Sequence, residues 1–197
     1  MHQEKQAERR IQIETAAYGL LALKGYKATS MLEVAKRAKA SNETLYKWYG
    51  NKQGLFLSMV ERNAETSLEQ LQSALTEDAS LRDILLAFGP ELLNTLTGQR
   101  AVVLNRAAAG DVHDTGMLGR TLADAGRASI IPLLTKIFGR FIEDGAPEEA
   151  AEIYYDLLIG DLQIRRVIGS VPLLKDEEID SRSRRATDLT LRLIGQA

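Results

Sequence analysis

The stretch from Ser30 to Lys52, SMLEVAKRAKASNETLYKWYGNK, constrains the fold of this chain more than any other feature. Ser30 and Glu33 have the spacing of a capping box, which predicts the start of a helix. Ser41 predicts the start of a second helix, because its hydroxyl can accept a hydrogen bond from a first-turn amide. Gly50 can adopt the left-handed conformation that ends such a helix. The stretch therefore predicts two short helices joined by a tight turn.

The two predicted helices have faces of different chemistry. The first has an apolar face of mostly small residues, formed by Met31, Val34, Ala35 and Ala38. Leu45 and Tyr49 lie one turn apart on the second helix and are expected to dock on that face. The other side of the second helix carries hydrogen-bonding, aromatic and cationic groups, namely Asn42, Glu43, Tyr46 and Lys47. This arrangement predicts a helix-turn-helix whose second helix enters the major groove of a duplex.

Residues from about Ile11 to Phe56 resemble the DNA-binding domain of the TetR family of transcriptional regulators. The resemblance lies in Gly25-Tyr26, Ala28-Thr29, Val34-Ala35, Ser41, Thr44-Leu45-Tyr46, Lys52 and Leu55-Phe56. Lys39-Ala40 departs from it, since the family usually has a glycine and then an apolar residue in this turn. Glu43 also departs, since a small residue is common there. The resemblance implies a DNA-binding domain over residues 1–52 and a helical ligand-binding and dimerisation domain over residues 53–197.

Several side chains of this head are predicted to contact DNA. They are Tyr26, Thr29, Ser30, Asn42, Glu43, Thr44, Tyr46, Lys47, Trp48 and Lys52. Asn42 and Glu43 are expected to face base edges, since Asn can bond adenine bidentately and Glu can accept from cytosine. The expected phosphate anchors are Tyr46, Lys47, Lys52 and the amides near Ser30 and Thr44. Trp48 either stacks on sugar and phosphate or shields the core, and Tyr26 either lies near the DNA backbone or packs internally.

The charge of the chain is distributed unevenly. Residues 1–56 carry ten Lys and Arg against five Asp and Glu, a net charge of +5, whereas the remainder carries −7. A solvated basic face would explain the charge alone, but its coincidence with a helix-turn-helix pattern favours binding to nucleic acid. Residues 1–9 are expected to be a disordered polar tail. Arg9 and Arg10 beside it are alternative phosphate contacts.

Helical periodicity continues to the end of the chain and no strand is predicted, so the expected fold class is all-α. The further helices are expected over about 52–75, from Ser80 onward with a kink or new start at Pro90, over 101–109, over 121–143 with a bend or new start at Pro132, over 147–168, and after 176–178. Residues 111–119, with three glycines at or near their ends, are expected to form a loop. These helices would make up the C-terminal domain.

The last two predicted helices are apolar on more than one side. Their apolar residues are Ile153, Leu157, Leu158, Ile164 and Val167 on the first, and Leu189, Leu191, Leu193 and Ile194 on the second. A helix of this kind must bury more than one side. We expect a homodimer through a four-helix bundle, and the alternative is that both faces are covered within the chain. The resemblance implies the same dimer, whose two reading helices would fit half-sites of a palindromic operator about 34–36 Å apart.

The resemblance also implies a small-molecule effector that binds in the C-terminal domain and changes the spacing of the two heads. On this basis the chain is expected to be a repressor that its effector releases from the operator, similar to the branch related to efflux-pump and surface-process regulators. Aromatic side chains with a few polar groups suit such a pocket. The candidates are Phe88, Leu92, Arg106, Tyr154, Tyr155 and Asp161. For each, core packing or an internal ion pair is the alternative.

Two other classes of protein are the alternatives. A helical enzyme has little support, because the chain has no cysteine, and His2 and His113 have no partner at catalytic or metal-ligand spacing. No catalytic residue, metal or cofactor is therefore predicted. A helical small-molecule-binding protein with a non-functional DNA head is the second alternative. The sequence has no run approaching the roughly 20 apolar residues of a membrane helix and no signal-like start, so a cytoplasmic location is expected.

Overall fold

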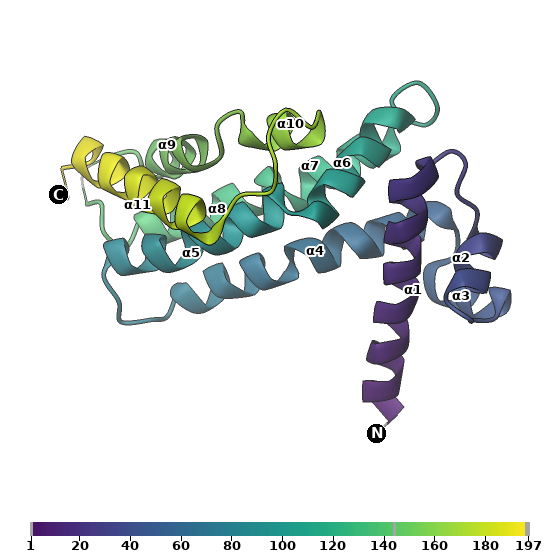
Figure 1. The fold of residues 1–197 in the computed structure, drawn as a ribbon. Coiled ribbons are helices and arrows are strands. Elements are labelled where there is room, and N and C mark those ends of the chain that lie inside the picture. Colours follow the sequence, from purple (N-terminus) through teal and green to yellow (C-terminus); the bar gives the residue numbers. More distant parts are fainter. Residues whose placement is uncertain (1, 144, 196–197) are drawn as a thin grey trace. The chain divides into compact units, whose positions relative to one another are not determined.

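The computed structural model of this chain describes residues 2–143 and 145–195, with side chains from residue 4 onward. Over these residues the chain is helical and contains no strand, which confirms the all-α prediction (Figure 1). The chain forms two compact units. Unit 1 is the chain up to Arg62 together with Val103–Leu122, and unit 2 is Asn63–Val102 together with the chain from Ala123 onward. The expected division into a DNA-binding domain over residues 1–52 and a C-terminal domain over residues 53–197 remains a prediction.

Three helices form the first part of unit 1: α1 (His2–Lys24), α2 (Met31–Arg37) and α3 (Asn42–Tyr49). Because α1 begins at His2, the predicted disordered tail is wrong for the described residues. The segment between Glu4 and Arg10 consists of good helix formers, which explains its continuity with the rest of α1. α2 packs on both α1 and α3, and the fully buried Ile13, Val34 and Leu45 lie in this small core.

The predicted helix caps are present in unit 1. The Ser30 hydroxyl accepts a hydrogen bond from the Glu33 amide at 3.3 Å, and the Glu33 carboxylate accepts one from the Ser30 amide at 3.0 Å. The Ser41 hydroxyl accepts from the Thr44 amide at 3.0 Å. Gly50 follows α3 with a φ of 73°. These local contacts fix both ends of the turn, and the helix-turn-helix prediction is confirmed.

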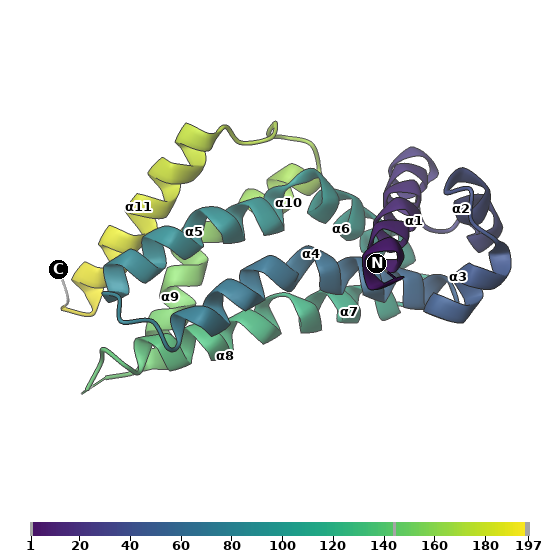
Figure 2. The ribbon, with the colours of Figure 1, turned by 90° about the horizontal axis from the view of Figure 1, so that it is seen from below.

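Three helices contribute residues to both units: α4 (Lys52–Ala74), α6 (Gln99–Asp111) and α7 (Met117–Ala125). Unit 2 contains in addition α5 (Leu81–Thr97), α8 (Arg127–Phe138), α9 (Pro147–Ile159), α10 (Leu162–Val167) and α11 (Asp176–Leu193). α8 packs on α9, and α11 packs on both α5 and α9 (Figure 2). The core of unit 2 includes Phe88, Leu92, Phe138 and Tyr154, each at most 1% exposed.

Several predicted helix boundaries were wrong. α5 continues through Pro90 and α8 continues through Pro132, so the new helix starts are wrong, whereas the alternative of a kink or bend at each proline stays a prediction. Gly110 lies inside α6 instead of ending it. The helix expected over 121–143 is divided at Gly126, and the one expected over 147–168 is divided at Gly160.

Side chains of other helices bond carbonyls of α5 near Pro90. A proline lacks the amide that would bond the carbonyl four residues earlier, which is that of Leu86. In α5, the Leu85 carbonyl accepts a hydrogen bond from the Tyr154 hydroxyl at 2.8 Å. The Ala87 carbonyl accepts one from the Gln70 side chain at 3.2 Å. Side chains from α9 and α4 therefore bond carbonyls next to the interruption.

Candidate nucleic-acid interface

The outward side of α3 is a polar surface. Its exposed side chains are Asn42, Glu43, Tyr46 and Lys47. On the inward side Leu45 is 0% exposed and Tyr49 is 9% exposed. The helix is thus held by two buried anchors, and the hydrogen-bonding and cationic groups predicted to contact DNA face solvent. A helix that reads the major groove requires this geometry, with buried anchors on one side and exposed polar groups on the other.

Trp48 lies at the edge of this surface and is half-buried. The Arg10 guanidinium of α1 lies 5.8 Å from the centre of its ring, a cation–π distance. The contact ties α3 to α1 and agrees with the shielding interpretation of Trp48. Stacking of Trp48 on sugar and phosphate remains a prediction.

Tyr26, Thr29 and Lys52 form one cluster where the chain enters α2. The Lys52 ammonium donates hydrogen bonds to the carbonyls of Tyr26 and Thr29 at 3.0 and 3.1 Å. It also lies 4.1 Å from the centre of the Tyr26 ring, whose edge meets Phe56 at 5.9 Å. Burial raises the pKa of Tyr26 to about 12. These contacts agree with the interpretation that Tyr26 packs internally, and its contact with the DNA backbone stays a prediction.

The Thr29 side chain belongs to the same turn. It is 4% exposed, and its hydroxyl donates to the Gly25 carbonyl at 2.8 Å. Its amide donates to the Tyr26 carbonyl at 3.1 Å. The polar atoms of Thr29 thus hold the turn that precedes α2. Its contact with DNA remains a prediction.

A loop between α6 and α7 also contacts the head inside unit 1, and sequence reasoning missed it. The Lys27 ammonium pairs with the Asp114 carboxylate at 3.0 Å, although the two residues are 87 positions apart in the sequence. The Asp111 side chain is buried and accepts hydrogen bonds from the Thr115 hydroxyl and the Leu118 amide. Burial lowers the pKa of the Lys52 ammonium, and the negative charges of Asp111 and Asp114 offset part of this lowering. No local sequence pattern predicts a contact between residues so far apart in the chain.

The predicted effector-binding residues do not form one group. Phe88, Leu92 and Tyr154 are fully buried in the core of unit 2, and burial raises the pKa of Tyr154. Tyr155 is 7% exposed beneath the Arg127 guanidinium, which lies 4.8 Å from its ring centre. Asp161 is exposed before α10, and Arg106 is exposed on the part of α6 that belongs to unit 1. Their role in effector binding remains a prediction.

Two further features are absent from the described residues. No group of three or more His, Cys, Asp or Glu side chains is placed to hold a metal ion there. In the same part of the chain, no helix combines the length and the apolar character needed to cross a membrane.

A capped helix-turn-helix with an exposed polar reading helix, carried by an all-helical chain, defines a DNA-binding transcriptional regulator. Comparison with known families agrees with this class. Residues 13–59 match the family of bacterial regulatory proteins called the tetR family, and residues 83–195 match the C-terminal domain of AefR-like transcriptional repressors. The chain belongs to the TetR family, whose members are DNA-binding regulators, typically responsive to ligands, and not enzymes.

Individual relatives support the same assignment. The chain is 30% identical over 198 residues to the HTH-type transcriptional repressor KstR of Mycolicibacterium smegmatis, covering 96% of this chain and 85% of KstR. A TetR transcriptional regulator from Agrobacterium tumefaciens is 29% identical, and its solved structure matches this one with a TM-score of 0.73. That comparison covers 94% of this chain and 93% of the Agrobacterium protein. The flavonoid-responsive regulator FrrA is 27% identical with a TM-score of 0.68, covering 95% of this chain and 97% of FrrA.

Proposed function

We propose that α3 enters the major groove of an operator and that its outward side chains read and hold the duplex. Asn42 and Glu43, in the first turn, face base edges, where an amide can pair with adenine and a carboxylate can accept from cytosine. Tyr46 and Lys47 bind phosphate oxygens. The observation that carries this proposal is the exposure of these four side chains on a helix anchored by buried Leu45 and Tyr49.

Three further predicted contacts, Ser30, Thr44 and Lys52, lie at helix starts around this surface. Ser30 caps α2, and the hydroxyls of Ser41 and Thr44 lie 2.7 Å apart at the start of α3. A helix N-terminus favours an anion, so phosphates on either side of the groove fit these positions. Lys52 has three ammonium protons and donates two of them to backbone carbonyls, which leaves one for a phosphate.

We further propose that the chain dimerises through α9 and α11 and reads a palindromic operator. Leu157 and Leu193 on these helices are 36% and 67% exposed, and Ile164 on the neighbouring α10 is 57% exposed. Apolar side chains on adjoining helices of unit 2 suit burial against a second copy. A twofold dimer supplies two reading helices for two half-sites one helical turn apart.

The effector is proposed to act on the helical core of unit 2. Phe88, Leu92 and Tyr154 pack there, and a ligand that enters among them would have to open this packing. A coupling of about 1–3 kcal/mol between ligand binding and DNA binding is enough for release from an operator. The chain would thus act as a repressor that a small molecule releases from its operator.

Selection of binding sites from random duplexes tests the reading surface. Tyr46→Ala removes a phosphate contact and should weaken every site alike, whereas Glu43→Ala should change the preferred base at one position of each half-site. Wild-type protein, selected in parallel, supplies the reference preference. An unchanged base preference in Glu43→Ala would remove Glu43 from the base-reading role.

A gel shift at increasing salt tests the alternative of a helical small-molecule-binding protein with a non-functional head. The duplex would be the promoter region beside the gene for this chain. A regulator should lose affinity by orders of magnitude as salt rises, because phosphate contacts release counterions. Absence of a shifted complex at low salt would favour the alternative.

A further inference from the structure

Lys39, in the turn between α2 and α3, is the one non-glycine residue with a positive φ in the part of the chain that the structure describes. Its φ of 52° lies in the left-handed region, which is strained for a residue with a Cβ atom. Glycine avoids this strain, and Asn and Asp can reduce it through local hydrogen bonds of their short side chains. Lysine has neither advantage, and the Lys39 side chain is exposed. Backbone strain of this kind often marks a functional position.

The two helices that flank the turn do not explain its charge. Cations are favourable in the last turn of a helix, and Lys36 and Arg37 already occupy that place in α2. Lys39 lies beyond the last residue of α2 and two residues before Ser41, which caps α3. The start of a helix is its positive end and disfavours a nearby cation. The ammonium of Lys39 therefore needs another partner.

Arg9 of α1 brings a second cation to the same turn. Its guanidinium donates hydrogen bonds to the Lys39 carbonyl and, at 2.7 Å, to the Gln12 side chain. A guanidinium has five N–H donors, so three are left for another acceptor. Within the described residues, neither Arg9 nor Lys39 forms an ion pair with a carboxylate. Two uncompensated positive charges thus share the turn that leads into α3.

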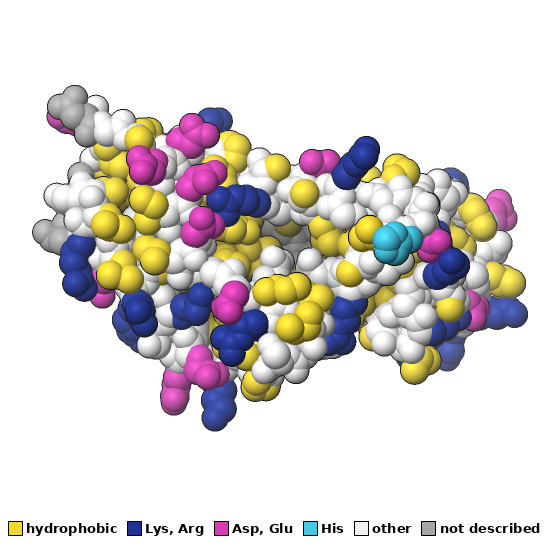
Figure 3. Space-filling model, turned by 90° about the horizontal axis from the view of Figure 1, so that it is seen from above, with side chains coloured by type: hydrophobic (Ala, Val, Ile, Leu, Met, Phe, Trp, Pro, Cys, Tyr) yellow, Lys and Arg dark blue, Asp and Glu magenta, His cyan; other side chains and the backbone are white. Residues whose placement is uncertain are grey.

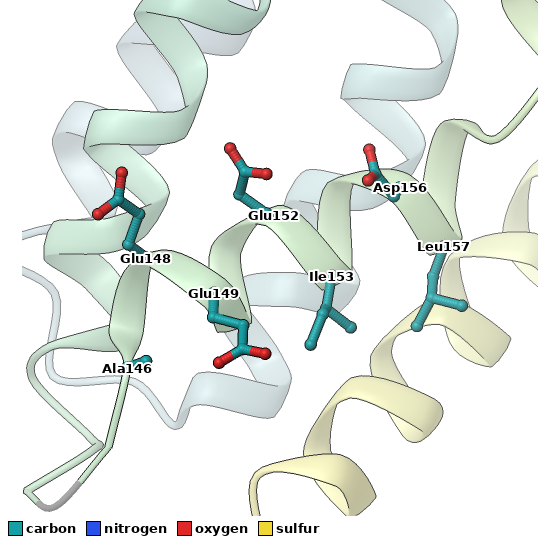
Figure 4. A pocket seen from close by; sticks show the side chains of 7 residues that line it. All are labelled: Ala146, Glu148, Glu149, Glu152, Ile153, Asp156 and Leu157. Atoms are coloured by element: carbon teal, nitrogen blue, oxygen red, sulfur yellow. The ribbon is translucent and has the colours of Figure 1, made fainter.

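Charged side chains on other parts of the molecule have neighbours of opposite sign. Figure 3 shows a face on which Lys and Arg lie next to Asp and Glu. On α9, Glu152 and Asp156 lie one turn apart on the same side of the helix (Figure 4), and Arg127 pairs with them at 3.0 and 2.7 Å. The two cations at the α2–α3 turn differ from these, because the acceptors that Arg9 has found there are a carbonyl and an amide.

We infer that Lys39 and Arg9 form a phosphate site for the duplex strand beside the start of α3, which this chain has in place of the turn glycine usual in its family. The inference rests on the proposed entry of α3 into the major groove. Because the first residues of a reading helix contact base edges, the turn directly before them lies beside the sugar-phosphate backbone. A guanidinium and an ammonium are the cations that bind phosphate oxygens. The strain at Lys39 is then offset by a contact that forms only on DNA.

The salt dependence of binding tests this site. Fluorescence anisotropy of the full chain would use the duplex obtained by the binding-site selection. Lys39→Gln and Arg9→Gln should each lower the slope of log affinity against log salt by about 0.9 per head, because each removes one phosphate contact. Lys39→Arg keeps the charge and should keep the slope. Lys136→Gln makes the same exchange at an exposed position of α8 in unit 2 and is the control, with an unchanged slope.

Lys39→Gly separates the DNA contact from the stability of the head. This variant loses both the ammonium and the strain, so its salt slope should fall by the same amount of about 0.9 while its resistance to urea rises. A loss of affinity in a more stable protein cannot arise from unfolding. Circular dichroism checks Arg9→Gln, which also loses the bond to the Lys39 carbonyl. If that variant unfolds, the Lys39 variants decide.

The outcomes distinguish this inference from the proposed function. A wild-type salt slope in Lys39→Gln and Lys39→Gly overturns the inference, and the roles of Glu43 and Tyr46 are then judged by their own variants. An altered base preference in Lys39→Gln also overturns it, since phosphate contacts carry no sequence information. If Glu43→Ala and Tyr46→Ala bind like wild type while Lys39→Gln has the lower slope, the proposed reading surface is wrong and the phosphate site stands. If wild type selects no duplex, both are overturned.

Discussion

The Lys52 ammonium lies 4.1 Å above the centre of the Tyr26 ring and donates a hydrogen bond to the Tyr26 carbonyl at 3.0 Å. A second hydrogen bond to the Thr29 carbonyl ties the first residue of α4 to the turn before α2. The position of the helix-turn-helix therefore depends on a cation whose charge is also suited to phosphate. We therefore expect Lys52 to contribute both to the stability of the head and to its affinity for DNA.

Lys52→Met should separate these two contributions, because it keeps most of the stem and removes the ammonium. Loss of two charge-assisted hydrogen bonds should lower the free energy of unfolding by about 1.5–3 kcal/mol, measured by urea denaturation. If the third ammonium proton binds a phosphate, the slope of log affinity against log salt should also fall by about 0.9 per head. A lower stability with an unchanged salt slope would restrict Lys52 to holding the turn.

Lys39 occupies the turn between α2 and α3 with a φ of 52°, in the left-handed region. This conformation costs a non-glycine residue about 1–2 kcal/mol, of which the greater chain entropy of an unfolded glycine cancels part. Lys39→Gly should therefore raise the free energy of unfolding by about 0.5–1 kcal/mol. Lys36→Gly, the same exchange within α2, is the control and should lower it by about 1 kcal/mol. A fall in stability for Lys39→Gly would mean that its side chain contributes more than the strain costs.

Glu33 should make the head sensitive to acid. The Lys24 side chain, followed by the Ser30 hydroxyl and amide, lowers the pKa of Glu33 from its usual 4.5 to about 2. Because the pKa is lower in the folded state, the carboxylate stabilises the fold above pH 4.5, and this contribution is lost as the pH falls toward 2. Thermal unfolding of wild type and Glu33→Gln should differ at pH 6 and converge near pH 2. A difference that stays constant over this range would contradict the predicted linkage.

The features predicted correctly from the sequence are local ones. The capping box of Ser30 and Glu33 and the burial of Leu45 depend on residues within one or two turns, so spacing alone reveals them. The Lys39 departure from the family's glycine did not predict its conformation, which the structure shows to be left-handed.

The features that were missed depend on distant partners. The ion pair of Lys27 with Asp114 forms only in the folded chain, and the sequence around either residue does not indicate this pair. α5 continues through Pro90, and Tyr154, on a helix far along the chain, bonds the nearby Leu85 carbonyl. The break at Gly160 has the same character, since Arg182 bonds the carbonyls that end α9. Tertiary hydrogen bonds thus accompany both the helix that continues through Pro90 and the helix that ends before Gly160.

Gly89 of α5 lies against Ser183 of α11 and Tyr154 of α9. A Cβ atom there would lie 2.2 Å from the Ser183 hydroxyl oxygen and 2.8 Å from that of Tyr154. Gly89→Ala should therefore lower the free energy of unfolding by about 1–3 kcal/mol, the usual cost of overpacking a core. Ser183→Ala in the same chain should recover only part of this loss, because the Ser183 Cβ would remain 3.0 Å away.

Gly110→Ala is the matched control for this substitution. Gly110 lies in α6 with nothing within 4 Å of its added Cβ, so alanine should raise the free energy of unfolding by about 0.5–1 kcal/mol through helix propensity. A double-mutant cycle of Gly89→Ala and Ser183→Ala, followed by urea denaturation, measures the coupling between the two positions. If the two changes are additive, the close approach of α5 and α11 relaxes elsewhere and Ser183 does not limit it.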